Sequence, residues 1–220
     1  MTPEAAALVA LIHLAYAEVD KRQAALPPAT TDRERLERLY DLDQAGRDAM
    51  MKVDLSQLPE DQQGVAIDAI AGEIVAHDRA NQAALKKMLP KTGWFRKSAI
   101  GDKAEAAAFL VVQHAVNDPD LMHATLPKIE AMVKIGEADG SNYALMYDRI
   151  ALEFDHKPQR YGSQVGCVEG RWVPADLEDP DRLDDRRRAL GLSSEADYLK
   201  GFETGPCDNS APASSSAPVP

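Results

Sequence analysis

The chain has 220 residues, and 45% of them are hydrophobic, which is enough for a buried core and too many for a wholly disordered chain. The 36 acidic residues outnumber the 25 basic ones and give a formal net charge of −11, which argues against general nucleic-acid binding because it repels phosphate backbones. Cys167 and Cys207 are too few for a disulfide framework or a cysteine-rich zinc site, and they leave room for one bridge in an oxidising compartment.

The longest apolar stretch, Ala5–Ala17, supports two interpretations. It is too short to span a bilayer, which needs about 20 apolar residues, but it has the length of a signal-peptide core. Its last three residues, Ala15-Tyr16-Ala17, have the small-x-small form of a cleavage site. Alternatively, Pro3 and Glu4 begin an ordinary first helix. The first interpretation predicts an exported, periplasmic protein and the second a cytoplasmic one.

Composition divides the chain into three segments. Residues 1–30 form an N-terminal helix or signal-like segment with a linker, residues 31–203 a single helical domain, and residues 204–220 a disordered tail rich in Ser, Ala and Pro. Within the domain, capping residues, prolines, glycines and a helical period of apolar residues predict five helices. These helices begin at Thr31-Asp32, Pro59, Gly101-Asp102, Asp118-Pro119 and Ser141, and they end near Val53, Leu89, His114, Asp139-Gly140 and Glu153.

The apolar period changes after the fifth helix. The segments 159–168 and 171–173, separated by Glu169-Gly170, predict a short β-hairpin with a tight turn. Two more short helices are predicted near 180–190 and 194–201. We therefore expect a mainly α protein, a helical bundle with a small β-hairpin appended near the C-terminal third.

Polar residues interrupt two apolar helix faces. Asp78 and Asn81 lie in the seam of the second predicted helix, and Asp148 lies in that of the fifth, with Arg149 on the next face. A buried carboxylate costs several kcal/mol unless it is paired or hydrogen-bonded. These residues therefore form either a structural network or a functional site with a general base or metal ligand.

His114 follows the apolar run of the third predicted helix, next to Gln113. Histidine suits acid–base catalysis because its ordinary pKa is about 6.5. A buried carboxylate such as Asp78 or Asp148 would orient the ring and stabilise its protonated form. The alternative is a core histidine whose hydrogen bonds are satisfied within the protein.

The segment Gln159-Arg-Tyr161-Gly162-Ser163-Gln164 has a dense set of hydrogen-bonding side chains. Two amides, a phenol and a hydroxyl surround a glycine, which allows close backbone approach or a positive φ. Such a set either grips a polar substrate or forms a turn that ties the hairpin to the bundle.

Taken in chain order, several short motifs resemble a bacterial family of unknown function, DUF6624. The motifs are Asp78-x-x-Asn81, Gly93-Trp94, Gln113-His114, Asp148-Arg149, the Gln159–Gln164 segment and the later Arg-rich helix. The resemblance covers about Asp32 to Phe202; this chain has Phe95 where members often have Pro, and Ser163 where they often have Thr. The family implies no activity, but the resemblance implies that one set of residues belongs together: Asp78, Asn81, His114, Asp148, Arg149, Gln159, Tyr161 and Gln164.

Two functions from different classes fit these residues. The first is a small hydrolase or transferase that acts on a polar substrate, with His114 and Asp148 catalytic and, because no nucleophile is evident, water as the attacking group. The substrate-binding residues would be Asp78, Asn81, Gln113, Arg149, Gln159, Tyr161 and Gln164. A variant of this hypothesis adds a divalent metal held by His114 and the carboxylates. The second function is a non-catalytic module that binds a small polar ligand, a peptide or a partner protein.

Other partners have no support in the sequence. No glycine-rich nucleotide loop and no zinc-ligand spacing occur, so no cofactor is predicted. We expect no nucleic-acid partner and no integral membrane segment, and the sequence leaves the oligomeric state open.

Overall fold

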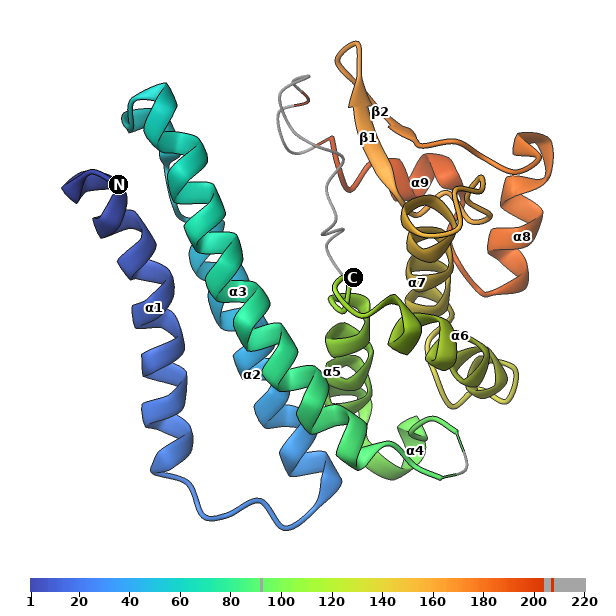
Figure 1. Cartoon of the computed structure of the whole chain (residues 1–220). Coiled ribbons are helices and arrows are strands. Elements are labelled where there is room, and N and C mark those ends of the chain that lie inside the picture. The colour runs from blue at the N-terminus through green and yellow to red at the C-terminus, as the bar shows by residue number, and fades with distance from the viewer. Residues whose placement is uncertain (92, 204–206, 208–220) are drawn as a thin grey trace. The chain divides into compact units, whose positions relative to one another are not determined.

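A computed structural model describes residues 1–91, 93–203 and 207, and it divides the chain into two compact units, Met1–Asp118 and Pro119–Pro220 (Figure 1). The chain is mainly helical (66%), with nine α-helices and one two-stranded antiparallel hairpin among the described residues. The predicted fold class is thereby confirmed. The predicted domain boundaries stay a prediction, and the predicted tail, apart from Cys207, lies outside the described residues.

The first unit is built from helices that lie side by side (Figure 1). Its elements are α1 (Pro3–Ala24), α2 (Asp32–Met50), the short 3-10 helix η1 (Leu55–Gln57), α3 (Glu60–Met88), α4 (Lys97–Ile100) and α5 (Asp102–Gln113). Helix α1 packs against both α2 and α3, and α2 packs against α5. The bounds of the long helices agree with the prediction to within a few residues, whereas η1 and α4 are too short for an apolar period to reveal.

Side-chain caps set where the helices of this unit begin. Thr2 accepts a hydrogen bond from the N–H of Ala5 at the start of α1. At the start of α2, Thr31 and Glu34 form a reciprocal capping box. Hydrogen bonds from the N–H groups of Thr30 and Thr31 lower the pKa of Glu34 to about 2. The capping box therefore fixes the end of the linker that joins α1 to α2.

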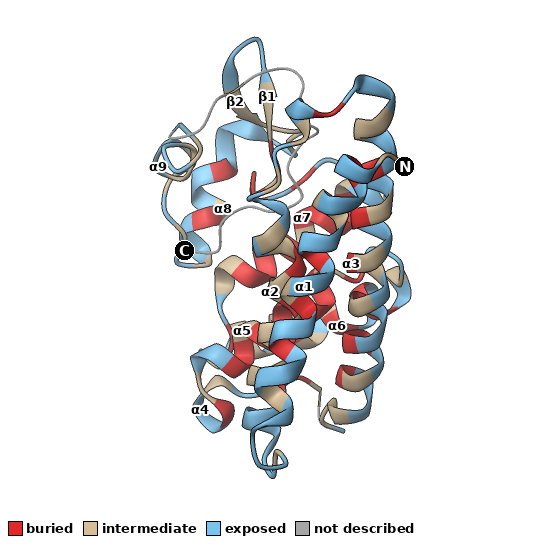
Figure 2. Cartoon of the chain, turned by 90° about the vertical axis from the view of Figure 1, so that its left-hand side faces the viewer, coloured by how far each residue is buried: buried red, intermediate tan, exposed pale blue. Residues whose placement is uncertain are grey.

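The stretch Ala5–Ala17 lies within α1 and packs as an ordinary helix. Ile12 and Tyr16 are buried in a cluster with isoleucines of α3. The opposite face of α1 is largely exposed, including Leu11 and Leu14 (Figure 2). Among the described residues, no helix combines the length and the hydrophobicity that crossing a membrane requires.

The second unit combines helices with the hairpin. Its elements are α6 (Pro119–Val133), α7 (Gly140–Glu153), β1 (Val165–Val168), β2 (Arg171–Pro174), the 3-10 helix η2 (Pro180–Arg182), α8 (Leu183–Ala189) and α9 (Glu195–Leu199). Helix α6 packs against α7 (Figure 1). The strands pair with Cys167 opposite Trp172, and a disulfide joins Cys167 to Cys207 with a Cα–Cα distance of 5.4 Å.

Three local expectations in this unit need correction. Helix α6 ends at Val133 and not near Asp139-Gly140, because the chain turns out of the helix at Gly136, whose φ is 73°. The fifth predicted helix, α7, begins at Gly140 and not at Ser141, because its N-cap is Asp139, whose carboxylate accepts from the N–H of Ser141. The first arm of the hairpin is shorter than predicted, because residues 159–164 form a loop before β1 begins at Val165. These residues do not pair as a strand, because they fold around the buried carboxylate of Asp148.

Candidate functional site

The predicted site residues fall into both units, and each unit builds its own polar cluster. The first unit holds Asp78, Asn81, Gln113 and His114, and the second holds Asp148, Arg149, Gln159, Tyr161 and Gln164. All of these side chains are buried except those of His114 and Gln164, which are partly buried.

His114 forms a pair with a carboxylate of α2. Directly after α5, its Nδ1 lies 2.9 Å and 3.0 Å from the two carboxylate oxygens of Asp43. The side chain of Asp43 is 1% exposed and that of His114 is 11% exposed. A carboxylate can only accept, so Nδ1 carries the proton and Nε2 holds the lone pair of the neutral ring. No residue that the structure describes bonds to Nε2.

An arginine links this pair to Asp78. Both terminal nitrogens of Arg47 donate to Asp78, at 2.9 Å and 2.8 Å, and one of them lies 3.5 Å from Asp43. Gln44 also donates to Asp43, at 2.7 Å. Burial by itself would raise the pKa of Asp43, but its contacts with His114 and Arg47 outweigh burial and hold that pKa below its ordinary value. Asp43 is therefore a buried carboxylate that His114 and Arg47 hold from two sides.

Sequence reasoning missed Asp43 and Arg47. It offered Asp78 or Asp148 as the carboxylate that orients His114, whereas the carboxylate in contact with the ring is Asp43. Asp78 reaches this pair only through Arg47. A signal was present, because Asp43 interrupts a buried face of α2 that also contains Leu36, Leu39 and Gly46, just as Asp78 interrupts the face of α3.

Helix α1 covers this network with Tyr16. The Tyr16 ring is stacked on that of His77, with centroids 3.5 Å apart and planes 4° apart. Its hydroxyl lies so near Gly46 that a Cβ added there would be 2.3 Å from the hydroxyl oxygen. Burial raises the pKa of Tyr16 above its ordinary range, so the hydroxyl keeps its proton. Among the described residues, neither this hydroxyl nor the amide nitrogen of Asn81 has a hydrogen-bond partner.

In the second unit, Asp148 binds the backbone of the loop 159–164. Its fully buried carboxylate accepts from the N–H groups of Arg160 at 2.7 Å, Tyr161 at 3.0 Å and Ser163 at 2.9 Å. Burial raises the pKa of Asp148, and the N–H groups of Ser163 and Arg160 oppose that shift. Both carboxylate oxygens are used in these bonds, and the loop is folded around them.

The side-chain amides of the two glutamines in the loop, Gln159 and Gln164, also bond to backbone groups. Gln159, also fully buried, donates to the carbonyls of Gln164 and Ala175, both at 2.9 Å, and accepts from the N–H of Gln164 at 2.9 Å. The Gln164 side chain donates to the carbonyl of Leu145 at 3.4 Å and to the hydroxyl of Ser163 at 3.2 Å. Both amides therefore fasten the loop, which favours the structural alternative for this segment.

Buried arginines complete the second cluster. Arg187 donates to the carbonyls of Tyr161 at 2.6 Å and Ser193 at 2.7 Å, and its guanidinium lies 4.7 Å from the centre of the Tyr198 ring. The Tyr198 hydroxyl in turn donates to the carbonyl of Ser163 at 3.0 Å. Arg149 is buried in α7, with its Nε 3.6 Å from a carboxylate oxygen of Glu153, which lies one turn further along the helix. Helices α8 and α9 therefore hold the loop from its other side.

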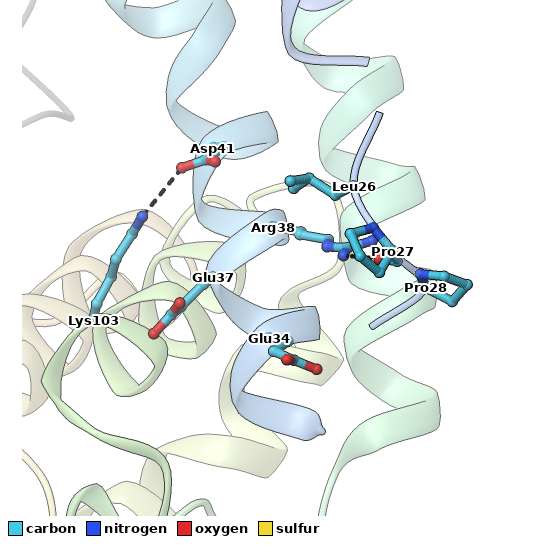
Figure 3. Close-up of a pocket in the computed structure, with 8 residues that line it drawn as sticks. All are labelled: Leu26, Pro27, Pro28, Glu34, Glu37, Arg38, Asp41 and Lys103. Carbon is cyan, nitrogen blue, oxygen red and sulfur yellow. Dashed lines mark hydrogen bonds and ion pairs between the residues drawn. The ribbon is translucent and has the colours of Figure 1, made fainter. Parts of the chain in front are cut away.

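A cavity of about 320 Å³ lies beside the linker between α1 and α2 (Figure 3). Its apolar wall comes from Leu26, Pro27 and Pro28. The charged side chains around it already have partners: Lys103 pairs with Asp41 at 3.3 Å, and Arg38 donates to the carbonyl of Pro27. These contacts favour a structural role, fixing the linker between α1 and α2, rather than a ligand site. Among the described residues, no group of three or more His, Cys, Asp or Glu side chains is arranged to hold a metal ion.

Comparison with known proteins identifies a family for this chain. Residues 30–206 match a family described as "Family of unknown function (DUF6624)". No curated protein and no solved structure matches the chain significantly. The matched range includes Asp43, Arg47, Asp78 and His114, whereas Tyr16 precedes it.

Proposed function

Because the chain belongs to DUF6624, whose function is unknown, we propose an activity from geometry: the first unit is an acid–base catalyst of hydrolysis or group transfer on a small polar substrate. His114 is the catalytic residue, and Asp43 positions it. One observation carries the proposal: a buried carboxylate bonds Nδ1 of His114, and Nε2 has no partner among the described residues. The His114 side chain is 11% exposed, and since Asp43 occupies Nδ1, Nε2 is the ring nitrogen that we assign to proton exchange.

The reaction requires one proton to move twice. Nε2 of His114 accepts a proton from water as the water oxygen attacks the substrate, and the ring returns the proton to the leaving group. The Asp43 carboxylate balances the positive charge that the ring holds between these steps. Arg47 and Asp78 keep Asp43 in place, since both ends of the guanidinium fork are bonded to Asp78. Asn81 supplies a buried amide donor for a substrate oxygen.

The predicted residues of the second unit have a different role in this proposal. Asp148, Gln159 and Gln164 bond backbone groups of one loop, which supports a framework function. Catalysis by Asp148 stays a prediction, and its contacts favour the alternative of a structural anchor.

Turnover of a panel of chromogenic esters, phosphate esters, glycosides and amino-acid anilides tests the proposal. We expect His114→Gln to reduce kcat about 10²- to 10⁴-fold, the usual contribution of a general acid–base residue. His123→Gln is the matched control, because His123 also pairs with a carboxylate, at 3.0 Å from Asp155, but both of its nitrogens are bonded. A folded His114→Gln variant that keeps full activity would exclude the proposed role.

The variant Asp43→Asn tests whether Asp43 positions the His114 ring for catalysis or only helps the chain to fold. We expect ¹⁵N NMR to show the Nδ1–H tautomer of neutral His114 in the native protein and a shift toward Nε2–H in this variant, because an amide can donate to Nδ1. A purely structural pair would leave turnover intact when the tautomer changes. Failure of the native protein to turn over any substrate class would favour the non-catalytic binding module.

A further inference from the structure

A second cavity, of about 270 Å³, lies entirely within the second unit. Its floor is apolar and includes Leu126 of α6 together with Ile150 and Ala151 of α7. Ile150 and Ala151 are 3% and 5% exposed, so the floor belongs to the packed interior of the unit. Ligand sites for drug-sized molecules measure about 300–1,000 Å³, so this cavity suits a smaller molecule with an apolar body.

One side of the rim holds two basic side chains, His123 and Lys157, that bond to one carboxylate. Both ring nitrogens of His123 face acceptors: Nδ1 lies 2.8 Å from the carbonyl of Pro119, and Nε2 lies 3.0 Å from Asp155. The hydrogen bond to Asp155 raises the pKa of His123 and favours its protonated form. Lys157 also bonds to Asp155, at 3.2 Å. Two basic side chains therefore share one carboxylate, and Lys157 keeps two N–H donors for other partners.

The rim also contains a carboxylate, that of Glu178. Its backbone carbonyl accepts from Arg186, and its charge acts on the nearby guanidinium of Arg160, but no described residue forms a hydrogen bond or ion pair with its side chain. The rim of the cavity thus presents a negative group and a positive group that both have bonding capacity left. Rim groups of opposite sign above an apolar floor complement a ligand that carries both charges on an apolar body.

We propose that this cavity binds a free α-amino acid with an apolar side chain about the size of leucine. The ammonium group bonds to Glu178, the carboxylate bonds to Lys157, and the side chain lies against Leu126 and Ile150. This site is separate from the acid–base pair of the first unit, and neither proposal depends on the other.

Titration of the full chain with L-leucine, followed by NMR of backbone amides, tests the site. Two analogues each remove one charge: leucinamide lacks the carboxylate, and 4-methylpentanoate lacks the ammonium group. We expect saturable shifts at residues of α6 and α7 that line the cavity, and weaker binding of both analogues. Absence of saturable shifts up to the solubility of leucine, or equal binding of 4-methylpentanoate, would overturn the proposal.

Exposed rim residues allow variants that leave the interior unchanged. Lys157→Gln is expected to weaken leucine binding about two- to fivefold, as for loss of an exposed ion pair. Leucine and leucinamide should then bind this variant with equal affinity. Glu178→Gln is expected to remove the advantage over 4-methylpentanoate. Glu169→Gln, in the exposed turn between β1 and β2, is the control and keeps native affinity. If leucine binds Lys157→Gln and Glu178→Gln as it binds the native chain, the assigned ion pairs are wrong.

Discussion

Two buried aspartates show how neighbouring groups decide what a carboxylate can do. Asp43 bonds a titratable ring, and a second atom of that ring has no partner among the described residues. Asp148 bonds three backbone N–H groups, which do not titrate at ordinary pH and so cannot act as acids or bases in catalysis. Burial costs several kcal/mol for each carboxylate, and polar contacts to the charged form oppose that cost. These contacts outweigh burial at Asp43, whose pKa is lowered, but not at Asp148, whose pKa is raised. Only the arrangement at Asp43 leaves an atom available for chemistry.

Asp148→Asn should destabilise the chain by about 3 kcal/mol, although the two side chains have nearly the same size. An amide offers one acceptor oxygen and places a donor against backbone N–H groups that then lose their partner. Urea unfolding of this variant beside Asp155→Asn, whose side chain is partly exposed, measures the effect. A loss equal to that of Asp155→Asn would mean that the loop does not depend on the carboxylate.

The sequence shows which buried polar residues need hydrogen-bonding partners, but it does not show which residues those partners are. Asp78, Asp148 and His114 stood out because polar groups interrupted apolar faces or runs, and the structure gives each of them polar contacts. Asp43 lies 71 positions from His114, and Arg47 lies 31 positions from Asp78. Such pairings depend on how the helices pack, which no local pattern encodes.

At the scale of elements, helices were predicted better than the segments between them. Caps, prolines and apolar periods mark helix ends locally, so α2, α3 and α5 could be located from the sequence. The loop 159–164 was taken as part of a strand because its polar and apolar residues suggested a hairpin arm. Its path is set instead by the Asp148 carboxylate, which accepts from N–H groups 12 to 15 positions later that a strand would need for pairing.

Two glycine-to-alanine changes should have opposite effects. Alanine normally stabilises a helix by about 1 kcal/mol relative to glycine, and Gly72 of α3 has nothing within 4 Å of an added Cβ. On α2, a Cβ at Gly46 would lie 2.3 Å from the Tyr16 hydroxyl oxygen. We therefore expect Gly72→Ala to raise the free energy of unfolding and Gly46→Ala to lower it, by about 1–3 kcal/mol. Thermal and urea unfolding decide this, and stabilisation by Gly46→Ala would show that α1 does not press on α2 here.

For the whole molecule, the disulfide joins two places that are far apart in the sequence. Cys167 of β1 and Cys207 are 40 positions apart, and the enclosed segment contains β2, α8 and α9. Helices α8 and α9 hold the loop 159–164 through Arg187 and Tyr198. The bridge therefore restrains the part of the second unit on which the Asp148 cluster depends.

Cys167→Ser with Cys207→Ser should lower the free energy of unfolding by about 3–4 kcal/mol, the loop-closure value for a bridge of this span. Hydrogen exchange locates the effect: we expect faster exchange in β1, β2 and α9, with α2 and α3 of the first unit unchanged. Equal protection of β1 and α9 in both proteins would show that the bridge adds no restraint.

The position of Tyr16 also bears on how the chain can be processed. A peptidase that recognises Ala15-Tyr16-Ala17 needs this tripeptide extended in its active site, but in the fold the tripeptide is helical and Tyr16 is stacked on His77. Cleavage requires residues 15–17 to be extended and folding requires them to be helical, so each event prevents the other. A chain that folds first is protected from cutting at this point, whereas a chain that is cut first folds with Gly46 and the Arg47–Asp78 pair uncovered.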